Sequence, residues 1–225
     1  MKSEIYKSFE MVQLNLSSKC HYYFKKENKK TIIITTGYAD FWYHTEITNY
    51  LIENNFNIYI IDVCYMGTAQ TETINNQITS IKDACQELDK YFSILKIFKN
   101  NNKIYWLSHS TSGLFAIRYY KIGQYGKNID KYIFNAPLFT LNTPDILTRI
   151  VLFIFAILGQ FKHFKDINGQ LNVGKISMSS KYVYENLGYQ IEKYSNYEIY
   201  KAELKLPVRL EFFTTVRKNT KLLKE

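Results

Sequence analysis

The segment Ser108–Gly113, with the sequence Ser-His-Ser-Thr-Ser-Gly, contains residue types at a spacing that could support chemistry. It follows a short β-branched and aromatic run, Lys103–Leu107, and precedes an apolar pattern of helical spacing. A serine at a tight strand-to-helix turn is the setting of a nucleophile elbow, and such a turn needs small residues two positions before and after the serine. Ser110 is therefore the candidate nucleophile, with Ser108 and Ser112 at the two small positions.

A helix cap is the competing interpretation of this segment, because serine and threonine are common at helix N-termini. The surrounding pattern favours the nucleophile. Polar or small residues end four of the predicted strands: Gly37, Asp62, Ser110 and Asn135. Ligands of parallel sheets bind at the carboxyl ends of the strands, so these four residues are expected at one functional edge. Asp62 itself is interpreted as a turn residue rather than a catalytic group.

The elements that must position these residues alternate between strand and helix. Strands are predicted at residues 11–16, 20–24, 31–36, 57–63, 103–107 and 131–135, and helices at 43–53, at 77–98 and after 113. In the second helix, apolar residues recur at steps of three and four, which marks one helical face. This alternation predicts an α/β fold with a mostly parallel, doubly wound sheet and helices on both faces.

The alternation of predicted strands and helices ends after Pro137. A strongly apolar helix is predicted from Pro144, a loop at 168–174 and a last helix from Leu206–Pro207, with basic residues near its end. The stretch Ile150–Leu158 is too short to span a membrane, which needs about 20 apolar residues. It is predicted to be buried, with an interfacial helix as the alternative.

Composition restricts the function classes. The chain has 225 residues, enough for a full core, and a net charge of +9. Its basic residues form no run longer than Lys25–Lys26 with Lys29–Lys30, which argues against nucleic acid as a partner. The N-terminus lacks the apolar core of a secretory signal.

The cysteines indicate neither a disulfide framework nor a metal site. The three residues Cys20, Cys64 and Cys85 share no C-x-x-C spacing and form no ligand pattern with the four histidines. We therefore expect reduced thiols, a cytoplasmic location, no metal and no cofactor.

The chain resembles the α/β-hydrolase superfamily, most closely its lysophospholipase-like and serine aminopeptidase-like branch. Four motifs carry the resemblance in the family's order: Ile34–Tyr38, Asp62–Gly67, Ser108–Gly113 and Asn135–Pro137. The first corresponds to a strand running into His-Gly-x, with Thr36 in place of the histidine.

The resemblance implies an activity. Ser110 would attack the carbonyl of a carboxylic ester, a lysophospholipid or monoacylglycerol, and the backbone N–H groups of Tyr38 and Thr111 would form the oxyanion hole. Residues 1–142 would be the α/β-hydrolase core and residues 143–225 the lid with its exit helix. The lid would pack over the carboxyl edge, with Phe153 and Phe155 lining an acyl-chain site.

The family's triad continues with an acidic residue and then a histidine after the elbow. The chain is expected to lack this C-terminal part, and only His163 follows the elbow, with Asp145 before it as a substitute pair. Without a histidine base, hydrolysis by this chain is expected to be weak. The alternative is a catalytically inactive remnant that binds an acyl chain, a membrane surface or a partner chain. A complementing C-terminal chain and a homo-oligomer remain open at this point.

Overall fold

The computed structural model describes residues 7–38, 40, 42, 44–63, 69, 80–99, 103–139, 146–147, 150, 154, 172–175, 207–209 and 215–219. The chain forms two compact units, of which the first combines Met1–Asn142 with Thr215–Glu225 and the second is Thr143–Thr214. The sequence placed residues 215–225 with the lid, whereas here they group with the first unit.

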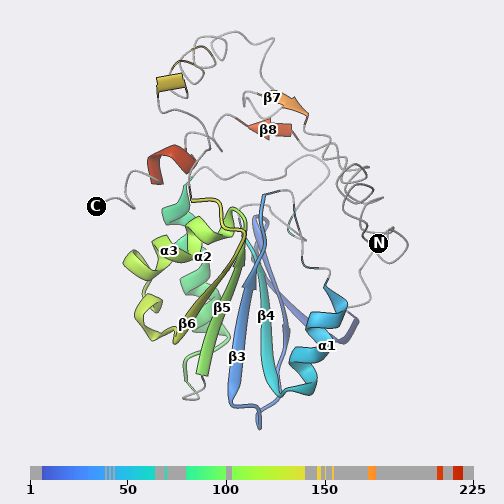
Figure 1. Cartoon of the computed structure of the whole chain (residues 1–225). Coiled ribbons are helices and arrows are strands. Elements are labelled where there is room, and N and C mark those ends of the chain that lie inside the picture. Colours follow the sequence, from blue (N-terminus) through green and yellow to red (C-terminus); the bar gives the residue numbers. More distant parts are fainter. Residues whose placement is uncertain are drawn as a thin grey trace. The chain divides into compact units, whose positions relative to one another are not determined.

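The first unit is built on one six-stranded sheet (Figure 1). Its strands are β1 (Glu10–Asn15), β2 (Ser18–Tyr23), β3 (Lys30–Thr35), β4 (Phe56–Asp62), β5 (Lys103–His109) and β6 (Lys131–Asn135). Their order is β1-β2-β4-β3-β5-β6. β3 pairs in parallel with β4 and β5, and β5 with β6, while β2 pairs antiparallel with both β1 and β4. The predicted mostly parallel sheet is confirmed.

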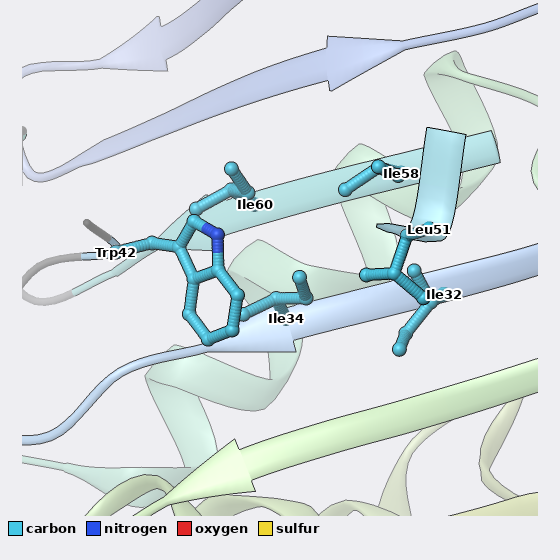
Figure 2. Close-up of a cluster of buried hydrophobic side chains, with 6 residues drawn as sticks. All are labelled: Ile32, Ile34, Trp42, Leu51, Ile58 and Ile60. Atoms are coloured by element: carbon cyan, nitrogen blue, oxygen red, sulfur yellow. The ribbon is translucent and has the colours of Figure 1, made fainter. Parts of the chain in front are cut away.

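One face of the sheet is covered by α1 (Thr45–Glu53) and has an aliphatic core. Figure 2 shows the cluster, in which alternate isoleucines of two neighbouring strands meet a leucine of the helix and a tryptophan: Ile32, Ile34, Ile58, Ile60, Leu51 and Trp42. Alternate residues of a strand point to the same face, so the residues between these isoleucines point to the opposite face of the sheet.

The opposite face is covered by α2 (Ile81–Ile94) and α3 (Ser112–Ile122) and has an aromatic core. The Trp106 ring of β5 packs edge-on against Phe92 of α2 and Tyr119 of α3, with centroid distances of 6.1 and 5.2 Å. Because helices pack on both faces, the predicted doubly wound arrangement is also confirmed.

Two predictions for the C-terminal part of the chain are wrong. Residues 172–175, expected in a loop, form β7 (Asn172–Lys175), which pairs antiparallel with β8 (Pro207–Arg209). The helix expected from Leu206 therefore does not begin there, and a helix occupies residues 215–219. The apolar spacing around Pro207 suggested a helix, but a proline also suits the first residue of a strand, where its missing N–H is tolerated. The strand partner lies more than 30 residues away and leaves no local pattern.

The apolar stretch Ile150–Leu158 is described only at Ile150 and Ile154, both about half exposed. Phe153 and Phe155 lie outside the described residues, as does the predicted packing of this stretch over the sheet edge. Among the residues that the structure describes, no helix is both long and apolar enough to cross a membrane.

Candidate active site

Ser110 lies in the turn between β5, which ends at His109, and α3, which begins at Ser112. Its φ angle is 53°, in the left-handed region that costs energy for a residue with a side chain. Three backbone hydrogen bonds hold it there. The Ser110 N–H donates to the Asn135 carbonyl (3.1 Å), and the Ser110 carbonyl accepts from the N–H groups of Gly113 (3.0 Å) and Leu138 (2.8 Å). The strained turn is therefore fixed by β6 and by the segment that follows it.

The two serines at the small positions of the elbow are fully buried. The Ser108 hydroxyl donates to the Ile133 carbonyl over 3.4 Å. The Ser112 Oγ lies 2.9 Å from the His109 N–H, 2.8 Å from the Thr35 carbonyl and 2.9 Å from the His109 carbonyl. The elbow therefore accommodates serine at both positions, and each hydroxyl makes a hydrogen bond that glycine could not make.

Gly113 is required by a close approach of the chain. A Cβ added there would lie 2.6 Å from the Pro137 Cβ, a separation that real Cβ atoms essentially never show. The segment after β6 thus packs directly on the first turn of α3. Glycine at this position keeps that segment within hydrogen-bonding distance of Ser110.

Gly37 follows β3 and lies against the candidate nucleophile. A Cβ added to Gly37 would lie 2.8 Å from the Ser110 Cβ and 3.2 Å from the Ser110 Oγ. Thr111, with φ −59° and ψ −32°, is the N-cap of α3, where backbone N–H groups lack intrahelical acceptors and favour negative charge. The loop that carries Tyr38 and the helix end that carries Thr111 therefore both adjoin Ser110.

Two imidazoles and a carboxylate gather beside this loop. The His109 ring has Nδ1 3.1 Å from the Asn135 carbonyl and Nε2 3.7 Å from Asp40 Oδ2. Burial lowers the pKa of His44, as does nearby His109 to a smaller extent, while Asp40 opposes the shift. Within the described part of the chain, no hydrogen bond joins the Ser110 hydroxyl to an imidazole.

The sequence analysis singled out neither Asp40 nor His44. Both belong to the irregular stretch between β3 and α1, where spacing predicts no shared face, so the sequence held no signal for them. The proposed substitute pair, Asp145 and His163, lies outside the described residues.

Asp62, at the carboxyl end of β4, is 1% exposed. The Thr36 hydroxyl lies 3.5 Å from Asp62 Oδ1 and 3.2 Å from the Asp40 carbonyl. Burial raises the pKa of the neighbouring Cys20 thiol well above its usual range, and the charge of Asp62 adds to the effect. This enclosure fits the structural role expected for Asp62. Among the described residues, no three His, Cys, Asp or Glu side chains are arranged so that they could hold one metal ion.

A mostly parallel sheet that runs into a strained serine turn, with a glycine backbone packed on that serine, defines an α/β-hydrolase. The chain belongs to the family described as serine aminopeptidase, S33, which matches residues 26–208. Among curated proteins, none matches this sequence.

Solved structures show the same fold. A soluble variant of monoglyceride lipase from Saccharomyces cerevisiae, in complex with a substrate analog, is 15% identical with a TM-score of 0.61, and the match covers 96% of this chain and 68% of that one. A carboxyl esterase from Bacillus coagulans in complex with glycerol is 12% identical with a TM-score of 0.60, covering 96% and 73%. A Paleococcus ferrophilus monoacylglycerol lipase is 14% identical with a TM-score of 0.59, covering 95% and 70%.

Proposed function

We propose that this protein is a serine hydrolase of carboxylic esters, with Ser110 as the nucleophile. One observation carries the proposal: Ser110 has a left-handed backbone at the end of β5, and the Gly37 backbone packs against its side chain. Ser110 itself is half-buried, and Tyr38 and Thr111, whose N–H groups are the proposed oxyanion donors, follow Gly37 and Ser110 directly in the chain. Membership of the serine aminopeptidase S33 family supports the same role.

The proposed reaction begins when the Ser110 Oγ attacks the ester carbonyl carbon and the carbonyl oxygen becomes an oxyanion. The N–H groups of Tyr38 and Thr111 are proposed to bind that oxyanion. Such donors act because they are already oriented when charge develops, and one donor contributes about 10²–10³-fold in rate. The Ser110 N–H is not available for this purpose because it donates to Asn135.

The proton of the attacking hydroxyl must pass to a base, and an unassisted serine hydroxyl is a weak nucleophile at neutral pH. Within the described residues, the imidazole of His109 is engaged with Asn135 and Asp40 rather than with Ser110. We therefore propose slow hydrolysis, resting on the oxyanion hole and substrate binding. In serine hydrolases with a disabled triad, these terms retain roughly 10³–10⁴-fold acceleration over water.

The proposed substrate is a monoacylglycerol- or lysophospholipid-like ester. The similar folds of a monoglyceride lipase, a monoacylglycerol lipase and a carboxyl esterase support this class. We propose that the apolar stretch Ile150–Leu158, with Phe153 and Phe155, receives the acyl chain.

The test combines a fluorophosphonate probe with hydrolysis of monoacylglycerol and a short-chain p-nitrophenyl ester. We expect slow labelling, located on Ser110 by peptide mass spectrometry, and slow hydrolysis of both esters. Ser110→Ala should abolish both signals. Ser108→Ala is the matched control at the small position two residues before Ser110. This variant should retain both signals, because the wild-type Ser108 hydroxyl makes only a long hydrogen bond.

Hydrolysis at the wild-type rate in Ser110→Ala would contradict the proposal. Monoacylglycerol binding without any Ser110-dependent turnover would support the inactive binding protein instead.

A further inference from the structure

The Ser112 hydroxyl connects the end of β3 with the elbow that follows β5. The strand pairing of the sheet does not join these two segments beyond their last paired residues. β3 and β5 run in parallel register up to the pair Thr35 and Ser108. After this pair, β3 continues into Gly37 and Tyr38, while β5 turns into the elbow. The Ser112 Oγ lies 2.8 Å from the Thr35 carbonyl and therefore continues the connection past the end of the ladder.

The other contacts of this hydroxyl anchor it to the elbow. Ser112 accepts a hydrogen bond from the His109 N–H over 2.9 Å. Its single proton can be donated to the Thr35 carbonyl at 2.8 Å or to the His109 carbonyl at 2.9 Å. The side chain is completely buried, so water is not at hand to replace these bonds.

A second hydrogen bond holds Thr35 through its side-chain hydroxyl. The Trp106 indole N–H donates to the Thr35 hydroxyl over 2.8 Å, and Thr35 is itself buried. Thr35 is thus fixed through its side chain by β5 and through its carbonyl by α3. Only one residue, Thr36, separates it from Gly37, whose backbone lies against Ser110.

We infer that Ser112 is a positioning residue of the active site: its hydroxyl sets the distance between the 36–38 loop and the elbow, and hence between the two oxyanion donors. This inference rests on the proposed function. A glycine or alanine at position 112 would fit the space but would leave the His109 N–H and the Thr35 carbonyl without this shared partner.

The test compares Ser112→Ala with wild type in the full chain. Because misplacement by about 1 Å can cost ~10²-fold in rate, we expect the kcat/KM for a p-nitrophenyl ester to fall about 10- to 100-fold. The loss should appear in kcat with KM unchanged, because the donors act on the transition state. The Ki of a trifluoromethyl ketone, which forms an oxyanion-bearing adduct with the serine, should rise by the same factor.

Ser18→Ala is the matched control. Ser18 is also fully buried, and its hydroxyl bonds to Asn15 over 2.7 Å and to the Tyr91 hydroxyl over 3.2 Å, away from the elbow. We expect this variant to lose stability while its kcat/KM and the Ki of the ketone stay at wild-type values. Ser112→Cys, which keeps a weaker donor of similar shape, should give an intermediate rate and serves if Ser112→Ala does not fold.

The outcomes distinguish failure of the positioning role from failure of the proposed function. Wild-type values of kcat and of the ketone Ki in folded Ser112→Ala, or in Ser112→Cys if only that variant folds, would overturn the positioning role and leave the proposed function intact. An equal loss of rate in Ser18→Ala would also overturn it, because the effect would then be one of general stability. A wild-type protein without Ser110-dependent labelling or turnover would overturn the proposed function and this inference with it.

Discussion

The carboxyl ends of β5 and β4 lie at the same edge of the sheet, yet they are built differently. β5 ends in a turn whose Ser110 has a positive φ and a half-buried side chain. β4 ends at Asp62, which is 1% exposed and lies beside the buried Cys20. A polar residue at the end of a parallel strand can thus stay partly accessible in a strained turn or be enclosed in the fold. Backbone strain and access distinguish the two cases here.

The strained end of β5 and the enclosed end of β4 should respond differently to substitution: changes beside Ser110 should reduce activity, and changes beside Asp62 should reduce stability.

Gly37→Ala should nearly abolish hydrolysis. The added Cβ would lie 2.8 Å from the Ser110 Cβ and 3.2 Å from the Oγ, so the 36–38 loop or the nucleophile must move. We expect a fall in kcat/KM of about 10²-fold or more, the cost of losing one oxyanion donor. Steady-state kinetics on a p-nitrophenyl ester measure it, with urea unfolding as the check on folding. Wild-type kinetics in a folded variant would show that the loop is not part of the site.

Gly113→Ala should destabilise the protein as well as slow it. The new Cβ would lie 2.6 Å from Pro137, and the segment after β6 would be pushed away from the Ser110 carbonyl. Overpacking of this kind costs about 1–3 kcal/mol in the free energy of unfolding. Urea denaturation measures the cost, and labelling of Ser110 by the fluorophosphonate probe should slow in parallel. An unchanged denaturation midpoint would mean that the segment around Pro137 can move to accommodate the added methyl group without cost.

Asp62→Asn should affect stability more than activity. An amide keeps the size of the carboxylate but changes its hydrogen bonding with Thr36, so we expect a loss of about 1 kcal/mol in the free energy of unfolding. The kcat/KM should stay within about threefold of wild type, because removing a catalytic general base typically costs at least 10²-fold. A loss of 10²-fold or more with normal stability would contradict the structural role and give Asp62 a part in the chemistry.

The Cys20 thiol should make the fold sensitive to alkaline pH. Burial raises its pKa well above the usual 9.0, with a further contribution from Asp62, so the unfolded chain loses this proton at a lower pH than the folded one. The unfolded state then binds fewer protons, and stability falls as pH rises above about 9. The slope approaches about 1.4 kcal/mol per pH unit for one such group.

Urea denaturation between pH 8 and pH 10 measures this slope, and Cys20→Ala should make it shallower. Cys85 contributes in the same direction, because burial raises its pKa to about 12, followed by the charge of Asp89. Cys20→Ala is therefore compared with Cys85→Ala, and equal slopes in wild type and both variants would contradict the assignment.

Local pattern predicted most of the first unit. The runs that became β3 and β4 are buried at nearly every position because helices cover both faces, and such strands appear in a sequence as continuous apolar runs. The small residues around Ser110 indicated a tight turn, and the structure has one, with the backbone held by Asn135 and Leu138. The helix α2 begins at Ile81, after the Ser80 N-cap, whose side chain accepts from the Asp83 N–H.

The local sequence pattern was misleading where a strand pairs with a segment far along the chain. Residues 172–175 and 207–209 form a strand pair although neither stretch has a clear strand pattern of its own, because cross-strand pairing is decided by a segment far along the chain. The approach of Asp40 to His109 is of the same kind, since an irregular connection brings it across from the end of β3 to the end of β5.

The sequence by itself determined the alternation of strands and helices, the sheet that follows from it and the placement of a serine in a strand-to-helix turn. These properties are local, because residue period, side-chain size and turn chemistry act over a few positions. Only the tertiary structure decided that Gly37 lies against Ser110 and that the Ser112 hydroxyl reaches Thr35. Those contacts join residues more than 70 positions apart, so their separations arise only from packing of the complete sheet.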